Sequence, residues 1–165
     1  MGTWMNNDGL YIKFGATEGA AGTSGAFEDG VAGQTVVELN IGDLTDLGTA
    51  AAIQDDNVFI PAGYTVTKVE LINTTAATSG GSAVLNVGLI RKDRSTELDY
   101  DGLIAAGALA TFNALGETVT YTAGSTGAGA LVGTVLVYPG YLTADYDTAA
   151  FTAGAVKIRV YLQKV

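Results

Sequence analysis

Strict alternation near the end of the chain constrains the fold more than any other feature. Residues 156–163 read VKIRVYLQ, so Val, Ile, Val and Leu alternate with Lys, Arg, Tyr and Gln. A period of two places successive side chains on opposite faces of a strand. The segment therefore predicts a strand with one buried and one wet face, which reaches back as far as Phe151.

Other β-rich runs follow one another along the chain, separated by turn residues. The predicted strands span residues 10–14, 35–41, 58–60, 64–73, 83–90, 118–122 and 129–138. The chain has 23 Gly, and the Gly-rich residues 74–82 predict a hairpin loop while residues 138–141 (YPGY) predict a Pro-Gly turn. Many short strands with Gly-rich turns indicate an all-β fold, a β-sandwich of jelly-roll type or a barrel.

Only two stretches have helical character, so at most two short helices are expected. Residues 43–54 predict a turn or two, and residues 101–116 carry apolar side chains near helical spacing, with Gly107 weakening the pattern. We expect a short helix across one end of the sandwich. With 165 residues the chain predicts one domain, residues 10–165, preceded by an extended N-terminal arm of residues 1–9.

The charge disfavours several classes of partner. The net charge is −9, and residues 1–60 carry nine acidic side chains against one basic. Nucleic acids and anionic lipids both require clustered Lys and Arg, so neither is expected as a partner. No apolar run approaches the roughly 18 residues of a membrane span, and the first ten residues lack the basic start and apolar core of a secretory signal.

Residue types needed for much of enzyme chemistry are missing. Without His or Cys, the chain has no Ser-His-Asp or Cys-His set and no His- or thiolate-based zinc site. The Gly-rich residues 124–133 lack the Lys-Ser/Thr ending of a phosphate loop and lead into a predicted strand. No spacing singles out a carboxylate pair for glycoside hydrolysis. We therefore predict no enzymatic activity and no cofactor.

The charge-dense residues 91–102 (RKDRSTELDYDG) have two readings. The first is a solvated loop in which the bases and acids neutralise one another. The second is a calcium site in which Asp93, Asp99 and Asp101 supply hard oxygens and Gly102 supplies the turn, although the spacing is not that of an EF-hand.

Several blocks resemble tailed-bacteriophage virion structural proteins. They are WMNNDGLYIKFG (4–15), the strand–loop–strand block 58–89, LDYDGLIAAGALA (98–110) and TAAFTAGAVKIRVYL (148–162), and together they cover nearly the whole chain. The resemblance implies a jelly-roll-like sandwich carried in many copies on the virion. It implies a capsid decoration (cement) protein, made in the host cytoplasm and placed on the outer capsid surface. Such a protein is often a homotrimer that bridges subunits of the major capsid protein.

Six residues are predicted to make protein contacts. Trp4, Met5, Tyr11 and Phe14 form a candidate clasp, because bulky aromatic side chains are enriched at interface anchors. Tyr11 and Phe14 have an alternative reading as core residues of a first strand, whereas Trp4 lies outside every predicted strand.

Tyr138 and Tyr141 flank the Pro-Gly turn, and Tyr146 follows shortly after. Tyr side chains on a loop either fill a protein pocket or stack on sugars. Two rival functions remain open: a tail, neck or fibre protein for host adhesion, and a glycan-cleaving enzyme with two facing carboxylates.

Overall fold

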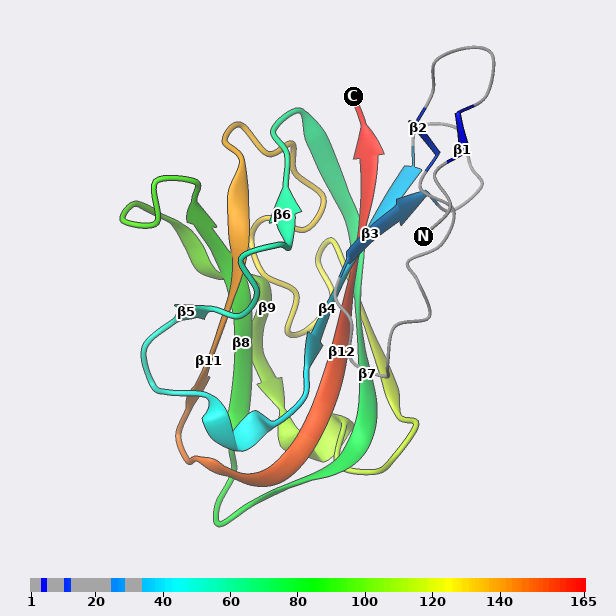
Figure 1. Ribbon diagram of the computed structural model, residues 1–165. Coiled ribbons are helices and arrows are strands. Elements are labelled where there is room, and N and C mark those ends of the chain that lie inside the picture. Colours follow the sequence, from blue (N-terminus) through cyan, green and yellow to red (C-terminus); the bar gives the residue numbers. More distant parts are fainter. Residues whose placement is uncertain (1–3, 6–10, 13–24, 29–33) are drawn as a thin grey trace.

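The chain folds into two antiparallel β-sheets packed face to face, as the computed structural model shows (Figure 1). Residues 34–165 are described in full, together with the backbone of residues 4–5, 11–12 and 25–28. The predicted all-β sandwich is confirmed. Helical structure in the described residues is confined to two 3-10 turns, Leu44–Asp46 (η1) and Leu109–Thr111 (η2).

The first sheet, called here the β12 sheet, has the order β10-β7-β12-β4-β3. Its strands are β3 (Gly25–Glu28), β4 (Gln34–Ile41), β7 (Tyr64–Ser79), β10 (Thr118–Thr122) and β12 (Phe151–Lys164). β12 lies between β4 and β7 and is antiparallel to both.

The second sheet, called here the β8 sheet, has the order β5-β11-β8-β9, with β6 also paired to β11. Its strands are β5 (Ala52–Ile53), β6 (Phe59–Ile60), β8 (Val84–Arg91), β9 (Glu97–Ala108) and β11 (Gly140–Asp147). A separate two-stranded pair joins β1 (Trp4–Met5) to β2 (Tyr11–Ile12).

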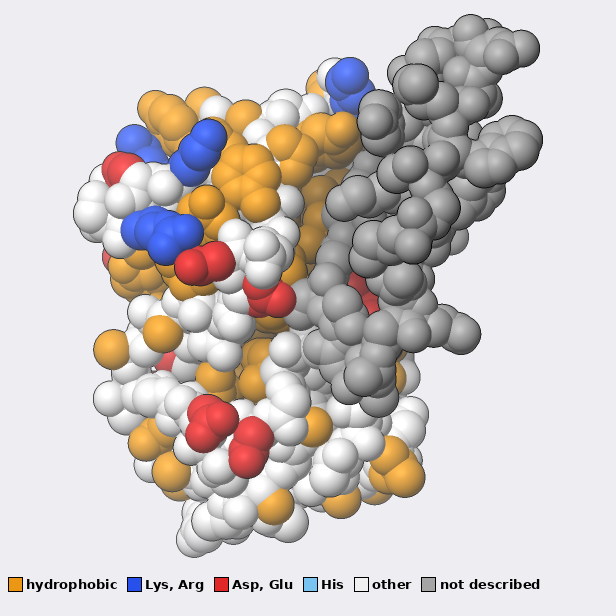
Figure 2. Space-filling model, viewed as in Figure 1, with side chains coloured by type: hydrophobic (Ala, Val, Ile, Leu, Met, Phe, Trp, Pro, Cys, Tyr) orange, Lys and Arg blue, Asp and Glu red, His pale blue; other side chains and the backbone are white. Residues whose placement is uncertain are grey.

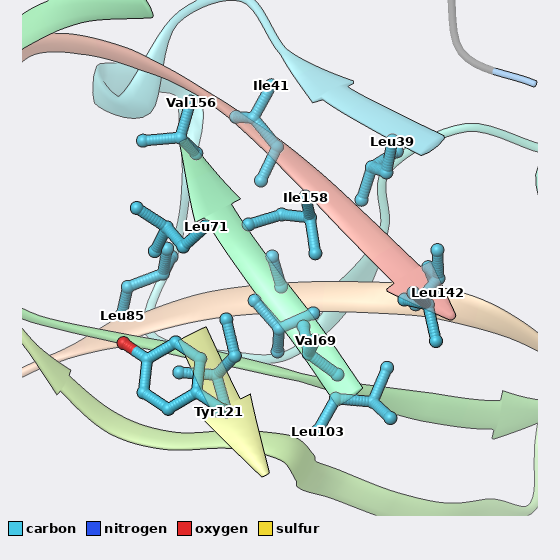
Figure 3. Close-up of a cluster of buried hydrophobic side chains, with 14 of the residues drawn as sticks. Leu39, Ile41, Val69, Leu71, Leu85, Leu103, Tyr121, Leu142, Val156 and Ile158 are labelled. Atoms are coloured by element: carbon cyan, nitrogen blue, oxygen red, sulfur yellow. The ribbon is translucent and has the colours of Figure 1, made fainter. Parts of the chain in front are cut away.

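The core fills the space between the two sheets (Figure 3). Leu39, Leu71 and Ile158 of the β12 sheet and Leu103 and Leu142 of the β8 sheet are completely buried. Full burial of one such side chain stabilises the fold by about 1.5–3 kcal/mol. The alternation predicted for residues 156–163 is confirmed, since its apolar side chains face this core and its polar ones face outward.

The predicted helix over residues 101–116 is wrong. Residues up to Ala108 belong to β9, and only η2 follows. The partner of Val87 is Ile104 but the partner of Leu89 is Asp99, so β9 bulges between these pairs. The bulge buries the consecutive residues Leu103 and Ile104, and this pair imitates helical spacing.

Two glycines fix the bulge by close approach. A side chain on Gly88 would collide with the backbone of Asp99 and Tyr100, which crosses directly over it. On Gly102 a Cβ atom would lie 2.6 Å from Leu131.

The predicted strand over residues 129–138 is also wrong. Residues 123–139, here called the strap, join β10 to β11 as an irregular segment that hydrogen-bonds to both sheets. Toward β9 these bonds are Ala105 N–Gly127 O at 2.9 Å, Gly129 N–Leu103 O at 3.2 Å and Leu131 N–Gly102 O at 2.8 Å. Toward β7 they are Gly133 N–Val66 O at 2.7 Å, Val66 N–Thr134 O at 3.2 Å and Leu136 N–Tyr64 O at 2.8 Å.

Three further predictions need correction. Residues 74–79 continue β7, and residues 80–83 cross to the other sheet, so the 74–82 segment is not a hairpin loop. No strand is predicted over residues 140–147, where β11 lies, because Gly140 belongs to the predicted Pro-Gly turn. Trp4 lies in a strand, β1, where it pairs with Ile12 of β2.

Candidate functional site

One end of the sandwich brings together three strands and the end of the strap. Gly140 of β11 pairs with Ile60 of β6 on one side and Arg91 of β8 on the other. The next residue, Tyr141, pairs with Phe59 and Ile90 in the same way. The β8–β9 turn and the strap therefore meet at this end, at the top of Figure 1.

Three basic side chains, one at the end of β8 and two in the β8–β9 turn, each lie over an aromatic ring. The pairs are Arg91 over Tyr138 at 3.8 Å, Lys92 over Phe59 at 6.0 Å and Arg94 over Tyr141 at 5.0 Å. Phe59 and Tyr141 also meet edge to face, with centroids 5.5 Å apart. We call these six residues the aromatic–cation cluster. Figure 2 shows blue basic side chains among orange hydrophobic ones at this end.

Hydrogen bonds fix the shape of the β8–β9 turn. The carboxylate of Asp93 accepts from Ser95 N, Thr96 N and Thr96 Oγ1 at 2.9, 2.9 and 2.7 Å. These bonds lower the pKa of Asp93 to about 2. Arg94 takes a left-handed conformation with φ 59°. The turn therefore presents its basic side chains from a fixed backbone.

The other carboxylates of this end also have partners. Asp56 lies 3.2 Å from Arg94, in an exposed pair that contributes little to stability. Glu97 accepts a long hydrogen bond of 3.4 Å from Tyr100 N. Within residues 34–165, no carboxylate lies at ion-pair distance from Arg91.

A pocket of about 300 Å³ opens beside Arg91. Polar and apolar atoms contribute about equally to its surface, and its lining comprises Arg91, Glu97, Leu98, Leu131, Val135, Leu136, Val137 and Tyr138. Val135, Val137 and Tyr138 are exposed by 48%, 74% and 46%, which is unusual for large hydrophobic side chains of this protein. The buried Nε atom of Arg91 has no hydrogen-bond partner. We call this the Arg91 pocket.

The predicted contact residues fall into two groups. Tyr138 and Tyr141 both lie in the aromatic–cation cluster, whereas Tyr146 packs inward against Phe151 with centroids 6.5 Å apart. Trp4, Met5 and Tyr11 lie in β1 and β2, whose side chains are outside the described part of the chain, as is Phe14.

Sequence reasoning missed Phe59 and the exposed valines of the strap, and it treated Arg91, Lys92 and Arg94 only as a self-neutralised run. The usable signal was the proximity of that charge-dense run and the Pro-Gly turn to strand ends. No sequence signal pairs Arg91 with Tyr138, because the pairing depends on the order of strands in the β8 sheet.

The outer face of the β8 sheet carries acids. Asp99 and Asp101 of β9 lie close together. Burial is the main reason that the pKa of Asp99 rises to about 6, and the neighbouring carboxyl group of Asp101 raises it further. Asp145 of β11 accepts a hydrogen bond from Asn86 Nδ2 at 2.7 Å, and burial raises its pKa. We call these three aspartates the acidic face.

The predicted calcium ligands do not form one set with Asp93, which is engaged in its own turn. Among the residues that the structure describes, no group of three or more acidic side chains converges as metal ligands would.

The outer face of the β12 sheet is ion-paired instead. Glu38 lies 2.9 Å from Lys157 and 2.8 Å from Arg159. Glu70 lies 2.8 Å from Lys68 and accepts a hydrogen bond from Tyr161 at 2.7 Å. Burial raises the pKa of Glu38, but hydrogen bonds from Arg159 and Lys157 outweigh it and leave the pKa lowered.

Comparison with known proteins gives a likeness in structure and none in sequence. No family model and no curated protein matches the chain. A chain of the "Capsid of Ralstonia phage GP4" is similar at TM-score 0.53 and 14% identity, over 84% of this chain and 89% of that chain. A chain of the "Cyanophage Pam1 capsid asymmetric unit" aligns at TM-score 0.49 and 17% identity, over 93% and 94%. The first likeness shows a shared fold. No helix in the described part of the chain is long and apolar enough to cross a membrane.

Proposed function

We propose that this chain is a non-enzymatic virion structural protein that decorates a phage capsid and bridges subunits of its major capsid protein. The sequence blocks that resemble phage structural proteins support this, and so does the fold shared with a chain of the phage GP4 capsid. In this proposal the protein is a homotrimer on the outer capsid surface, made in the host cytoplasm. Residues 1–9 act as an arm and residues 10–165 as the single domain.

The aromatic–cation cluster is the observation that carries the contact role. Aromatic residues and Arg are enriched at protein interfaces and among the residues that dominate binding energy. Here they lie beside the exposed Val135 and Val137, at an end where a fixed turn and three strand ends form one surface. A surface of this composition supports binding to protein.

The arm and the first strand after it supply the second proposed contact. Trp4, Met5, Tyr11 and Phe14 would clasp a neighbouring subunit, with β1 and β2 as the paired base. Deleting residues 1–8 is expected to abolish capsid binding while the domain still folds, measured by co-sedimentation with undecorated capsids and by circular dichroism. Unfolding of the truncated protein, or binding at full strength, would contradict the clasp.

Copy number on the particle tests the whole proposal. Quantitative mass spectrometry of purified virions should give a ratio near one chain per major capsid protein, or one trimer per local threefold axis. A handful of copies per virion would favour the alternative, a tail, neck or fibre protein for host adhesion. Absence from the virion would end both proposals.

A further inference from the structure

We infer that the Arg91 pocket anchors a partner segment in which a carboxylate side chain stands next to an apolar one. This inference rests on the proposed function, because it gives the chemistry of the partner that the aromatic–cation cluster would contact. It specifies a short acidic–apolar peptide segment as occupant, rather than nucleic acid, lipid or a whole folded face.

The apolar half of the site is already formed. Leu98, Leu131 and Leu136 make the wall and floor, and the exposed Val135 and Val137 stand at the rim. A volume of about 300 Å³ is at the small end of ligand sites. It therefore accommodates one or two side chains, which would cover surface that the isolated chain leaves in water.

The polar half lacks an acceptor. Each nearby carboxylate is committed elsewhere: Asp93 to its turn, Asp56 to Arg94, and Glu97 to Tyr100 N. Arg91 is left without an ion pair among the described residues. A guanidinium matches a carboxylate in a two-bond geometry, which makes a carboxylate the complementary group.

Arg91 is also held in place before any partner arrives. Its guanidinium stacks 3.8 Å over Tyr138, while its backbone N–H donates to Thr96 O at 2.8 Å. A side chain that is already ordered loses less conformational entropy on binding, so more of the contact energy appears as affinity.

Glu97 at the rim restricts the partner further. A polyanion such as nucleic acid would meet Glu97, Asp93 and Asp56 together with the bases. Nucleic-acid binding needs uncompensated Lys and Arg clusters, which this end does not offer. A single carboxylate directed at Arg91, with its apolar neighbour in the pocket, avoids those acids.

The test uses the full-length protein, ¹⁵N-labelled, and two blocked peptides. Ac-Val-Leu-Glu-NH₂ should shift the amide signals of Arg91, Leu98 and Val137 to saturation. Its amide analogue Ac-Val-Leu-Gln-NH₂ should bind about tenfold more weakly, because the neutral amide cannot form a charge-assisted pair with the guanidinium.

Variants separate the pocket from general surface charge. Arg91→Gln should weaken the Glu peptide about tenfold, whereas Lys157→Gln, which removes a base on the outer face of the β12 sheet, should change it less than about twofold. Val137→Ser tests the apolar half at an exposed position where folding is not at risk. It should also weaken binding.

Equal binding of the two peptides, or no saturable shift at the pocket, would overturn the inference. Self-association that Arg91→Gln abolishes would identify a second copy as the occupant and overturn the partner assignment. Because the titration uses the isolated protein, it is independent of copy number on the virion. Peptide binding by a chain that is absent from particles would refute the proposed function and leave the pocket standing.

Discussion

The two sheets bury their inner faces in the same way but treat charge on their outer faces in opposite ways. On the β12 sheet, Glu38 and Glu70 each contact basic side chains within 3 Å. On the β8 sheet, the acidic face has no basic partner among the described residues. The difference shows that outer charges contribute to the stability of one sheet and oppose that of the other.

The direction of the pKa shifts records this contrast. The pKa of Glu38 is lowered, since its basic partners favour the charged carboxylate. The pKa of Asp99 is raised to about 6, because burial and Asp101 disfavour its charged form. Acidic side chains on the two sheets therefore change stability with opposite sign as pH changes.

The largest loss in the free energy of unfolding is expected from a substitution in β8, where the backbone of β9 crosses over it. Gly88→Ala would place a Cβ atom against the backbone of Asp99 and Tyr100, so the β9 bulge must move. We expect a loss of about 3 kcal/mol in the free energy of unfolding, the upper end of overpacking costs, in urea titration.

The matched control lies at the end of β4 in the other sheet. Gly42 has nothing within 4 Å of the position of an added Cβ. Gly42→Ala should leave stability unchanged or raise it by up to about 1 kcal/mol. Equal losses in the two variants would show that the crossing over Gly88 is not the constraint.

A smaller effect breaks the ion-paired face. Glu38→Ala leaves Lys157 and Arg159 without this carboxylate, and we expect a loss of about 1 kcal/mol because the pairs are partly exposed to solvent. A double-mutant cycle with Arg159→Ala should give a coupling of about 0.5 kcal/mol. Additive losses would mean that the pair contributes only through packing.

The smallest effect sharpens the comparison through pH. The folded-state pKa of Asp99 exceeds its unfolded value, so its stabilising contribution is full below about pH 4 and is lost as pH rises through about 6. Between pH 5 and pH 8 the melting temperature of the wild type should therefore fall, and Asp99→Asn should reduce that fall.

Asp93 and Glu38 act in the opposite direction and in a different range. Their lowered pKa values stabilise the fold above about pH 4, and this stability is lost on further acidification. Asp93→Asn therefore serves as the control that leaves the pH 5–8 difference intact. An unchanged pH dependence in Asp99→Asn would show that other groups cause it.

The sequence alone predicts a strand when one face of the strand lies against the core and the other faces water. Residues 156–163 alternate because one face of β12 is buried over this stretch, and the prediction is confirmed. The helix predicted over residues 101–116 is wrong, since a bulge held by Gly88 buries Leu103 and Ile104 consecutively. The spacing of apolar residues in one sequence does not show that the backbone of β9 crosses over Gly88.

The conformation of the strap and the assembly of the aromatic–cation cluster likewise depend on tertiary structure. Val132 and Leu136 are buried, but the hydrogen bonds of the strap go to two different sheets, so no regular strand forms. Tyr138 and Tyr141 could be singled out from their turn. Arg91, by contrast, becomes part of a site only because β8 pairs with β11.

The central place of β12 has a consequence for how the protein is made. Its contacts join residues far apart in the sequence, since the residue numbers of Arg159 and Glu38 differ by 121 and those of Tyr161 and Glu70 differ by 91. β4 and β7 emerge from the ribosome earlier and do not pair with each other. Closure of the sandwich must therefore wait for translation of β12, and such long-range pairing folds slowly. A ribosome-bound chain without β12 would expose two unpaired strand edges to cellular chaperones.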